Sequence, residues 1–390
     1  MTAAEAAAHL GVSRATLYAY VSRGRIRSQA VPGRVRERGY ARDDVERLRR
    51  RAEERKQPGK AAAHSLQWGL PILESAITLI DGHRIYYRGH EATVLATTRT
   101  VEEVATLVWT GTMGAFERQH LPGDLPDAPA PSRFIARAQT LLAAAAAADP
   151  GASDTRAEAV RRRGGHILRL LTRAATRRDP ADRPVDAALA RAWRLGPDGA
   201  ALVRAALILS ADHELNVSSF TARAVASAGS GPYAVVIAAL AALEGARHGG
   251  STARAEAMLG SLGRERQPRA AVAARLQRGE RLDGFGHPLY PDGDPRAAAL
   301  LAWVAAARPA SPERRVVEAV ARAAEAATGE RANLDYGLAA LAHVLRLPAG
   351  APLMLFAIGR AIGWIGHALE QYATGQLIRP RAQYVGVRPA

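Results

Sequence analysis

The stretch GFGHPLYPDGDPRA, residues 284–297, interrupts a chain that is otherwise patterned for helices. It holds three glycines and three prolines, so neither a helix nor a strand is expected there. His287 lies in this loop between Gly286 and Pro288. Glycine lets a backbone approach a ligand closely, and loops held by rigid helices commonly carry reactive groups. The loop therefore predicts a ligand site that includes the His287 imidazole.

The sequence around this loop predicts an all-α fold. From about residue 65 almost to the end, the chain is rich in Ala, Leu and Arg at helical spacing. Residues 74–96, ESAITLIDGHRIYYRGHEATVLA, include a short alternating portion with an Asp-Gly turn, which is typical of strands. The chain has 390 residues and 48% hydrophobic residues, enough for a large core and more than one domain. We expect residues 61–390 to be mostly helical with very little sheet.

Residues 1–60 differ in composition and predict a small winged helix-turn-helix domain. Two short helices are expected on either side of Gly11, with Ser13 placed to cap the second one. Two strand-like runs then flank Pro32-Gly33, and a further helix is expected to begin near Asp43. A helix pair followed by a basic hairpin resembles the MerR-type and excisionase-like DNA-binding modules.

The basic charge is concentrated in the same segment, which predicts a polyanionic partner. Residues 1–60 hold 15 Lys and Arg against 7 Asp and Glu, a net +8 of the chain's formal +16. In a helix-turn-helix the second helix enters the major groove, and wing side chains meet phosphates. The predicted DNA-binding residues are Arg14, Thr16 and Tyr20 on the second helix and Arg34, Arg36 and Arg38 on the wing. The alternative is a module that only mediates assembly.

Absent sequence features narrow the class of protein further. The chain has no cysteine, which excludes disulfides, thiol catalysis and cysteine metal sites and fits a reducing cytoplasm. The N-terminus lacks a secretory signal, and no uncharged apolar run reaches the roughly 18 residues of a membrane span. No phosphate-binding loop or zinc-protease motif occurs. We expect a cytoplasmic protein without a metal site.

Four polar segments interrupt the helical background and supply candidate site residues. They are ADHELNVSSFTARAVAS (211–227) with His213, LEGARHGG (243–250) with His248, the loop with His287 and Arg296, and NLDYGLAAL (333–341) with Asp335. Arg360 and Arg379 follow in apolar surroundings. Three arginines suit recognition of several carboxylates, and burial raises the pKa of an aspartate toward that of a base near neutrality. This set suits proton abstraction beside a carbonyl, with a di- or tricarboxylate substrate.

The motifs occur in the order and at the separations of the citrate synthase family, which the sequence resembles over about residues 74–386. DHELNVSSFTAR resembles that family's DHE-N-[AV]-S-[TS]-F motif, GARHGG its GP-[LR]-HGG, and GFGHPLYPDGDPRA its GFGH…DPRA loop. NLDYGLAAL resembles its N-[VL]-DFYSG segment, and ITLIDGHRIYYRGHE, AIGRAIGWIGHALEQ and LIRPRAQYVG resemble its remaining pieces. The resemblance implies the citrate synthase fold, with a large domain and a small subdomain at about 249–341.

The resemblance also implies an activity, the condensation of acetyl-CoA with oxaloacetate to give citrate and CoA. His248 would stabilise the enol of acetyl-CoA at the thioester oxygen, and Asp335 would remove the methyl proton. His287 would polarise and protonate the ketone of oxaloacetate. Acetyl-CoA is a substrate in this reaction, so no bound cofactor is expected.

The implied substrate-binding residues are His213, Arg296, Arg360 and Arg379, the last reaching into the partner subunit's site of a homodimer. His287 is followed by Pro-Leu-Tyr where many family members have Arg-Val-Tyr, which removes a cation from the side of the loop expected to face CoA. Propionyl-CoA as the donor, giving 2-methylcitrate, is therefore an open alternative. A transcriptional regulator that uses the citrate synthase body as a metabolite sensor is another.

Overall fold

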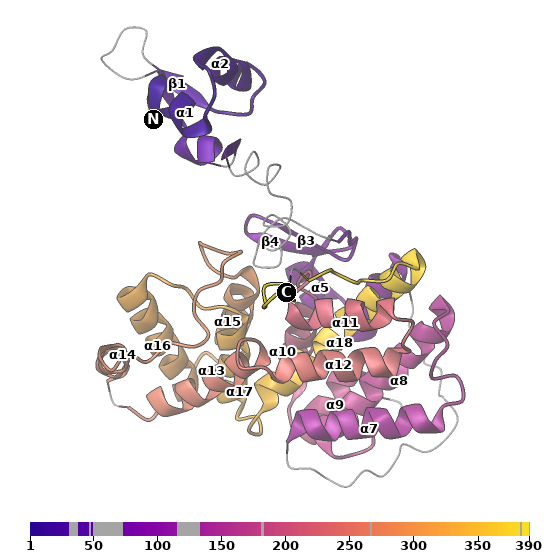
Figure 1. Cartoon of the computed structure of the whole chain (residues 1–390). Coiled ribbons are helices and arrows are strands. Elements are labelled where there is room, and N and C mark those ends of the chain that lie inside the picture. Colours follow the sequence, from indigo (N-terminus) through magenta and orange to yellow (C-terminus); the bar gives the residue numbers. More distant parts are fainter. Residues whose placement is uncertain are drawn as a thin grey trace. The chain divides into compact units, whose positions relative to one another are not determined.

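The protein is represented by a computed structural model, which describes residues 1–30, 38–46, 48–49, 73–114, 133–180, 183–265, 267–382 and 384–389. The chain divides into two compact units, residues 1–74 and 75–390, each with its own hydrophobic core (Figure 1). The boundary predicted between residues 60 and 61 lies outside the described residues.

The N-terminal unit is a helix-turn-helix followed by a two-stranded hairpin. Helices α1 (Ala3–Leu10) and α2 (Arg14–Ser22) are joined at Gly11, whose φ of 62° is a left-handed conformation that glycine adopts without strain. Ser13 caps α2 as predicted, because its hydroxyl accepts the Thr16 amide proton at 3.2 Å. Strands β1 (Ser28–Ala30) and β2 (Arg38–Tyr40) pair in antiparallel register, as expected for a wing.

A small core and one buried carboxylate hold this unit together. The core consists of Ala6, Ala7, Leu17, Ile26, Tyr40 and Val45. Asp44 lies in the helical stretch 42–46, and its buried carboxylate accepts the backbone and Nε protons of Arg27, each at 2.9 Å. This contact joins the residue that precedes β1 to the helical stretch that follows β2, so the wing is fixed at its base.

The second unit begins with a small sheet and continues as a helical body, which confirms the predicted all-α class. Its meander contains β3 (Thr78–Asp81), β4 (Arg84–Tyr87) and β5 (His90–Glu91), with antiparallel pairing and a turn at Gly82. The helices after it are α5 (Ala92–Thr98), α6 (Val101–Thr110), α7 (Phe134–Ala148), α8 (Ala157–Thr176), α9 (Val185–Ala192), α10 (Pro197–Leu209), α11 (Val217–Ser227), α12 (Pro232–Glu244), α13 (Gly249–Leu262), α14 (Pro268–Gln277), α15 (Pro295–Ala307), α16 (Pro312–Thr328), α17 (Leu334–Leu345) and α18 (Ala351–Thr374).

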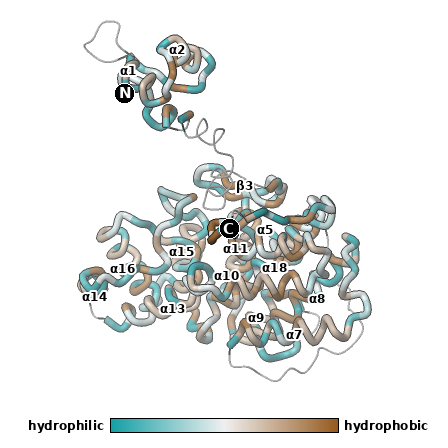
Figure 2. Tube along the Cα trace, in the orientation of Figure 1, coloured by the Kyte–Doolittle hydropathy of each residue, from teal (hydrophilic) through white to brown (hydrophobic). Residues whose placement is uncertain are grey.

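Helix α18 is the central element of this body. It packs against α6, α8, α10, α11, α12, α13 and α17, and most of its side chains are buried. Two of its glycines allow this close packing, since a Cβ at Gly359 would lie 2.4 Å from the Leu207 carbonyl oxygen and one at Gly363 would lie 2.4 Å from the Asp212 carboxylate. Figure 2 shows hydrophobic stretches gathered where α10, α11 and α18 lie, and hydrophilic residues on α14 and the outer turns.

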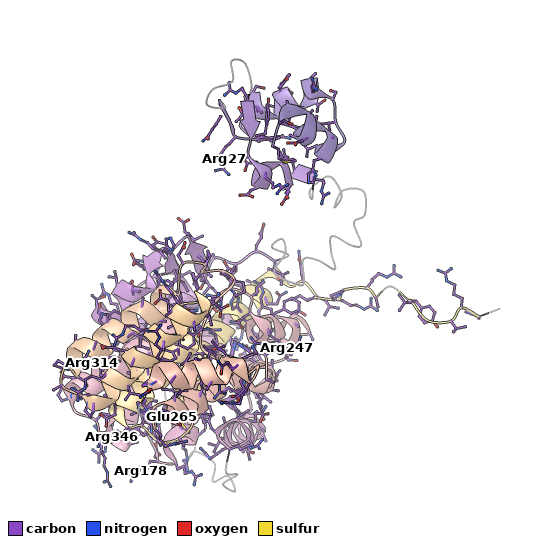
Figure 3. All side chains as sticks on the ribbon, turned by 90° about the vertical axis from the view of Figure 1, so that its left-hand side faces the viewer. Arg27, Arg178, Arg247, Glu265, Arg314 and Arg346 are labelled. Carbon is purple, nitrogen blue, oxygen red and sulfur yellow. The ribbon has the colours of Figure 1, made fainter. Side chains whose placement is uncertain are left out.

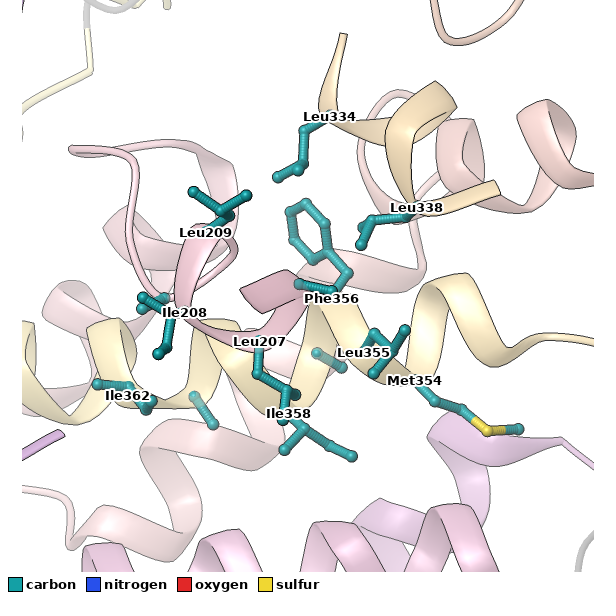
Figure 4. Packing of buried hydrophobic residues seen from close by; sticks show 14 of the residues in the cluster. Leu207, Ile208, Leu209, Leu334, Leu338, Met354, Leu355, Phe356, Ile358 and Ile362 are labelled. Atoms are coloured by element: carbon teal, nitrogen blue, oxygen red, sulfur yellow. The ribbon is translucent and has the colours of Figure 1, made fainter. Parts of the chain in front are cut away.

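Helices α13 to α17 cover the range in which the small subdomain was predicted, residues 249–341, and that subdomain stays a prediction. They pack mainly on one another, in orange tones in Figure 1. Helices α15 and α17 contact α10, and α13 and α17 contact α18. Figure 4 shows the Phe356 ring of α18 pointing toward Leu334 and Leu338 of α17. Residues Leu207, Ile208 and Leu209 of α10 lie beside α18 in the same view.

By length and hydropathy, α18 is the one described helix that matches a membrane span. Its most apolar window is 94% buried inside the fold, as expected of the core helix of a large helical body.

Candidate active site

Three aromatic rings meet where the loop at residues 284–294 approaches the segment after α10. The His213 Nε2 lies 2.9 Å from the Tyr290 hydroxyl, and the centroids of the His213 and His287 rings are 5.1 Å apart. The His287 and Tyr290 rings are 5.0 Å apart. The fold therefore brings together two of the predicted histidines, and it adds Tyr290, which sequence reasoning missed.

The hydrogen bonding of His287 fixes its tautomer. Its Nδ1 accepts the Leu289 amide proton at 3.2 Å, so the neutral ring carries its own proton on Nε2. Burial, followed by the positive charge of Arg296, lowers the pKa of His287 to about 4. At neutral pH this imidazole is an uncharged N–H donor, which suits it to polarise a carbonyl oxygen. Burial also lowers the pKa of His213 well below its usual range.

Asp294 fixes Arg296 and joins two helices at the site. It receives two hydrogen bonds from the Arg296 side chain, from Nε at 2.9 Å and from Nη2 at 2.7 Å. The same carboxylate caps α15 and accepts the Leu334 amide proton of α17 at 3.1 Å. Arg296 is therefore held rigidly in a buried ion pair, with Nη1 outside the bidentate contact. This role of Asp294 connects the loop to the helix that carries Asp335.

Arg360 is a buried cation without a protein carboxylate against it. Its side chain is 1% exposed, its Nε donates to the Ser210 carbonyl at 2.8 Å, and it lies over the Phe356 ring at 4.6 Å. Among the described residues it forms no ion pair. Burial lowers the pKa of Arg360 to about 10. Because an uncompensated buried charge is costly, this guanidinium favours an anionic ligand.

His248 lies directly before α13 and is oriented by a hydroxyl. Its Nε2 lies 2.7 Å from the Ser218 Oγ, and Trp364 Nε1 donates to the same oxygen at 3.0 Å. The Phe356 ring contacts His248 edge-on, with centroids 5.8 Å apart, and so lies next to both His248 and Arg360. Burial lowers the pKa of His248 to about 4, so this imidazole is also neutral at pH 7. Trp364 was not among the predicted site residues.

Asp335 lies in the first turn of α17, and its side chain is half-buried. The Asn333 side chain accepts the Asp335 amide proton at 3.0 Å, which fixes the start of the helix. Thr252 of α13 donates a hydrogen bond to the carboxylate at 2.5 Å. Burial raises the pKa of Asp335, and the hydroxyls of Thr252 and Ser251 oppose that rise. The result is a carboxylate suited to accept a proton.

A buried contact between His367 and Asp212 supports the backbone beside His213. His367 of α18 and Asp212 are both fully buried, with Nε2 and Oδ1 3.1 Å apart. Asp212 also accepts the Thr78 hydroxyl proton at 2.6 Å and the Glu214 amide proton at 3.1 Å. Although burial acts in the opposite direction, His367 and the other partners keep the pKa of Asp212 below its usual value.

Arg379 does not join these groups within the same chain. It is exposed in the segment after α18, which has no regular secondary structure. Figure 3 shows this C-terminal segment, in yellow, extending away from the helical body. The predicted position of Arg379 in a partner subunit's site stays a prediction.

Helix α2 of the N-terminal unit exposes Tyr18 more than the predicted Tyr20. Tyr20 packs partly against the small core, whereas Tyr18 is 51% exposed. Arg14 and Ser22 are also exposed, and the four-residue spacing places both on the same face of α2 as Tyr18. Thr16 is half-buried and its hydroxyl lies 2.9 Å from that of Ser13. Tyr18 is therefore the more exposed aromatic residue of α2, and a DNA contact of Tyr20 stays a prediction.

The predicted wing residues are only partly described. Arg38 is exposed on β2 and donates to the Ser28 carbonyl at 3.3 Å. Arg34 and Arg36 lie outside the described residues.

The second unit thus holds one half-buried carboxylate, two buried guanidiniums and three imidazoles that are neutral at pH 7. These belong to Asp335, to Arg296 and Arg360, and to His213, His248 and His287. Such a set supports proton abstraction by the carboxylate, hydrogen-bond donation to oxygens by the imidazoles, and binding of a carboxylate-rich ligand by the arginines. Within the described part of the chain, no three His, Asp or Glu side chains are placed to hold a metal ion.

Comparison with known families matches both units. The family model for "Citrate synthase, C-terminal domain" matches residues 65–381, and the model for "Helix-turn-helix domain" matches residues 1–52. The first match covers most of the chain, including every predicted catalytic residue.

Individual relatives agree with these matches. "Putative citrate synthase 2" of Mycobacterium tuberculosis (strain ATCC 25618 / H37Rv) is 38% identical over 206 residues, covering 50% of this chain and 55% of the relative. The "2-methylcitrate synthase" of Shewanella oneidensis is 35% identical over 187 residues, covering 47% of this chain and 50% of the relative. The chain thus spans about half the length of the curated relatives it matches.

A solved structure matches over a greater length. The ternary complex of Thermoplasma acidophilum citrate synthase with carboxymethyl coenzyme A and oxaloacetate is 25% identical, with a TM-score of 0.68. It covers 84% of this chain and 97% of the solved chain.

Proposed function

The chain belongs to the citrate synthase family, and on this premise we propose that it condenses acetyl-CoA with oxaloacetate to give citrate and CoA. The observation that carries the proposal is the shared position of Asp335, His248 and Arg360. Arg360 is an unpaired buried cation, and the Phe356 ring lies against both it and the His248 imidazole. Burial raises the pKa of the Asp335 carboxylate, which lies within electrostatic reach of Arg296 and Arg360.

The proposed chemistry begins with proton transfer from the methyl group of acetyl-CoA to the Asp335 carboxylate. The enol that forms is stabilised by a hydrogen bond from His248 to the thioester oxygen. Since Nε2 of His248 faces the Ser218 hydroxyl, Nδ1 is the ring nitrogen assigned to this bond. The Ser218 hydroxyl also has the Asn216 Oδ1 as an acceptor, at 2.9 Å. The assignment therefore requires the single Ser218 proton to be donated to Nε2 in place of Asn216, with Trp364 donating to the hydroxyl oxygen.

Carbon–carbon bond formation then joins the methyl carbon to the ketone carbon of oxaloacetate. The Nε2 proton of His287 is placed to protonate the ketone oxygen, and Arg296 and Arg360 are assigned to the carboxylates. His213, held by the Tyr290 hydroxyl, completes this side of the site. Water then hydrolyses the citryl thioester and releases free CoA.

The proposed assembly is a homodimer in which Arg379 enters the partner subunit's site, and the proposed setting is the cytoplasm. The exposure of Arg379 on a C-terminal segment that extends from the helical body supports the first part. The absence of cysteine supports the second, because a chain without thiols gains nothing from an oxidising compartment.

Free CoA release tests the enzymatic proposal. Purified protein with oxaloacetate and either acetyl-CoA or propionyl-CoA is expected to release thiol, and the ratio of kcat/KM for the two donors assigns the acyl preference. Propionyl-CoA is the alternative donor because 2-methylcitrate synthases are among the relatives of this chain. Absence of release with both donors would leave the sensor alternative, in which the same pocket binds ligand without turnover.

We further propose that residues 1–60 bind DNA. The exposed face of Arg14, Tyr18 and Ser22 supports this, together with the net charge of +8 over residues 1–60. Binding to duplex DNA is expected to weaken steeply between low and physiological salt, because phosphate contacts release counterions. In the full chain, Tyr18→Ala is expected to weaken DNA binding and Tyr20→Phe to leave it unchanged. Salt-insensitive or absent binding favours an assembly module instead.

A further inference from the structure

The carboxylate of Asp335 is held by hydroxyl groups that come from the helix beginning at His248. Thr252 is fully buried in the first turns of α13, and its hydroxyl donates to the Asp335 Oδ1. The hydroxyl of the neighbouring Ser251 also lowers the pKa of the same carboxylate. A threonine in a helix commonly returns its hydroxyl to a carbonyl of its own preceding turn, as Thr172 does with Leu168 at 2.7 Å. Thr252 instead spans two helices.

The start of α13 therefore carries both His248 and the hydroxyl that binds the Asp335 carboxylate. His248 lies directly before α13, and Ser251 and Thr252 lie in its first turns. The Asp335 backbone is held separately, by the Asn333 side chain, and its neighbour Leu334 by Asp294. The Asp335 carboxylate is therefore positioned by α13, the helix that His248 directly precedes.

We propose that Ser251 and Thr252 are positioning residues that orient the Asp335 carboxylate to accept a proton from the methyl group of acetyl-CoA. This proposal rests on the proposed function. A hydroxyl that donates to a carboxylate stabilises the charged form and leaves one oxygen less able to accept a proton. Because Thr252 occupies Oδ1, proton transfer from the substrate is directed to Oδ2.

The charged groups around Asp335 do not substitute for the hydroxyl groups in stabilising the ionised carboxylate. Arg296 lowers the pKa of Asp335 and Asp294 raises it, and these two are paired with each other. Arg360 on α18 also lies within electrostatic reach. Helix α16 meets α17 through the Tyr336 hydroxyl on the Val317 carbonyl, which is uncharged. The Thr252 hydroxyl on α13 is thus the direct hydrogen-bond donor to the carboxylate, while the charges of Arg296 and Asp294 largely offset one another.

The pH dependence of kcat/KM for acetyl-CoA, at saturating oxaloacetate, tests this proposal. In Thr252→Val, which keeps the shape and removes the hydroxyl, the acidic limb of the profile is expected to move up by about one pH unit. At pH values below the apparent pKa of the wild-type limb, kcat/KM of the variant is then about tenfold lower than that of wild type, and the difference disappears at higher pH. Thr252→Ser restores the wild-type profile, and Ser251→Ala moves the limb in the same direction by a smaller amount.

The matched control is Thr172→Val, another fully buried threonine whose hydroxyl bonds only to its own helix. It is expected to leave the limb in place even if stability falls. A loss of activity in Thr252→Val that is equal at every pH, or an unchanged limb in both Thr252→Val and Ser251→Ala, overturns the proposal. An inactive wild-type protein refutes the proposed function itself, which is a distinguishable outcome.

Discussion

Replacement of Arg360 by Met is expected to separate ligand binding from folding. Burial lowers the pKa of Arg360 from 12.5 to about 10, which corresponds to roughly 3 kcal/mol by which the folded protein disfavours the charged side chain at neutral pH. This cost is fully present below about pH 10, where the guanidinium is charged in both the folded and unfolded states. Arg360→Met removes that cost and loses one hydrogen bond to the Ser210 carbonyl, worth about 1 kcal/mol. The ligand-free protein should therefore be as stable as wild type, or more stable.

Oxaloacetate binding should respond in the opposite direction. Loss of a buried guanidinium that pairs with a carboxylate is expected to raise the dissociation constant at least about 100-fold, or roughly 2.8 kcal/mol. At a fixed oxaloacetate concentration, the ligand-induced rise in Tm should shrink accordingly. Differential scanning fluorimetry with and without oxaloacetate measures both effects in one experiment.

Arg223→Met is the matched control, because Arg223 is also a buried arginine but is paired with Glu370 at 3.5 Å and Gln371 at 3.0 Å. It should lower the Tm of the ligand-free protein and keep the oxaloacetate-induced shift. If Arg360→Met instead lowers the ligand-free Tm and retains the oxaloacetate-induced shift, Arg360 is a structural residue and the anion-site reasoning is wrong.

Two further predictions concern the base and the imidazoles. Asp335→Asn should abolish turnover, since the amide cannot accept the proton, while the oxaloacetate-induced Tm shift persists; loss of both would contradict the role of Asp335 as a base. His248 and His287 have folded pKa values of about 4 against an ordinary 6.5, so the folded state binds fewer protons than the unfolded state between these pH values. Their contribution to stability is full above about pH 6.5 and is lost as the pH falls toward 4. A Tm of the second unit that stays constant over that range would show that these rings are not buried as neutral groups.

Helical class and motif order were predictable from the sequence because they depend on local patterns. Glycine and proline mark the loop at residues 284–297, and Ser13 occupies the cap position that its spacing predicts. The strand pair β3 and β4 likewise follows from alternation around an Asp-Gly turn. These features need no knowledge of which helices pack together.

Contacts between distant helices were not predictable in this way. The second function of Asp294, as a link between α15 and α17, depends on the packing of those helices. The Thr252 contact with Asp335 joins residues 83 positions apart. The choice between Tyr18 and Tyr20 depends on which face of α2 docks on the small core, and both residues have the same local pattern. Side-chain partners across helices therefore had to come from the structure.

Carbon–carbon bond formation at the acyl methyl group is the central claim, and isotopic labelling tests it directly. Acetyl-CoA labelled with carbon-13 at the methyl position is incubated with oxaloacetate and the full chain, and the products are followed by carbon-13 NMR. The predicted result is a labelled methylene signal of citrate that appears with free CoA and is absent in Asp335→Asn. Labelled free acetate, or unchanged acetyl-CoA, with the wild-type protein would contradict the proposed condensation.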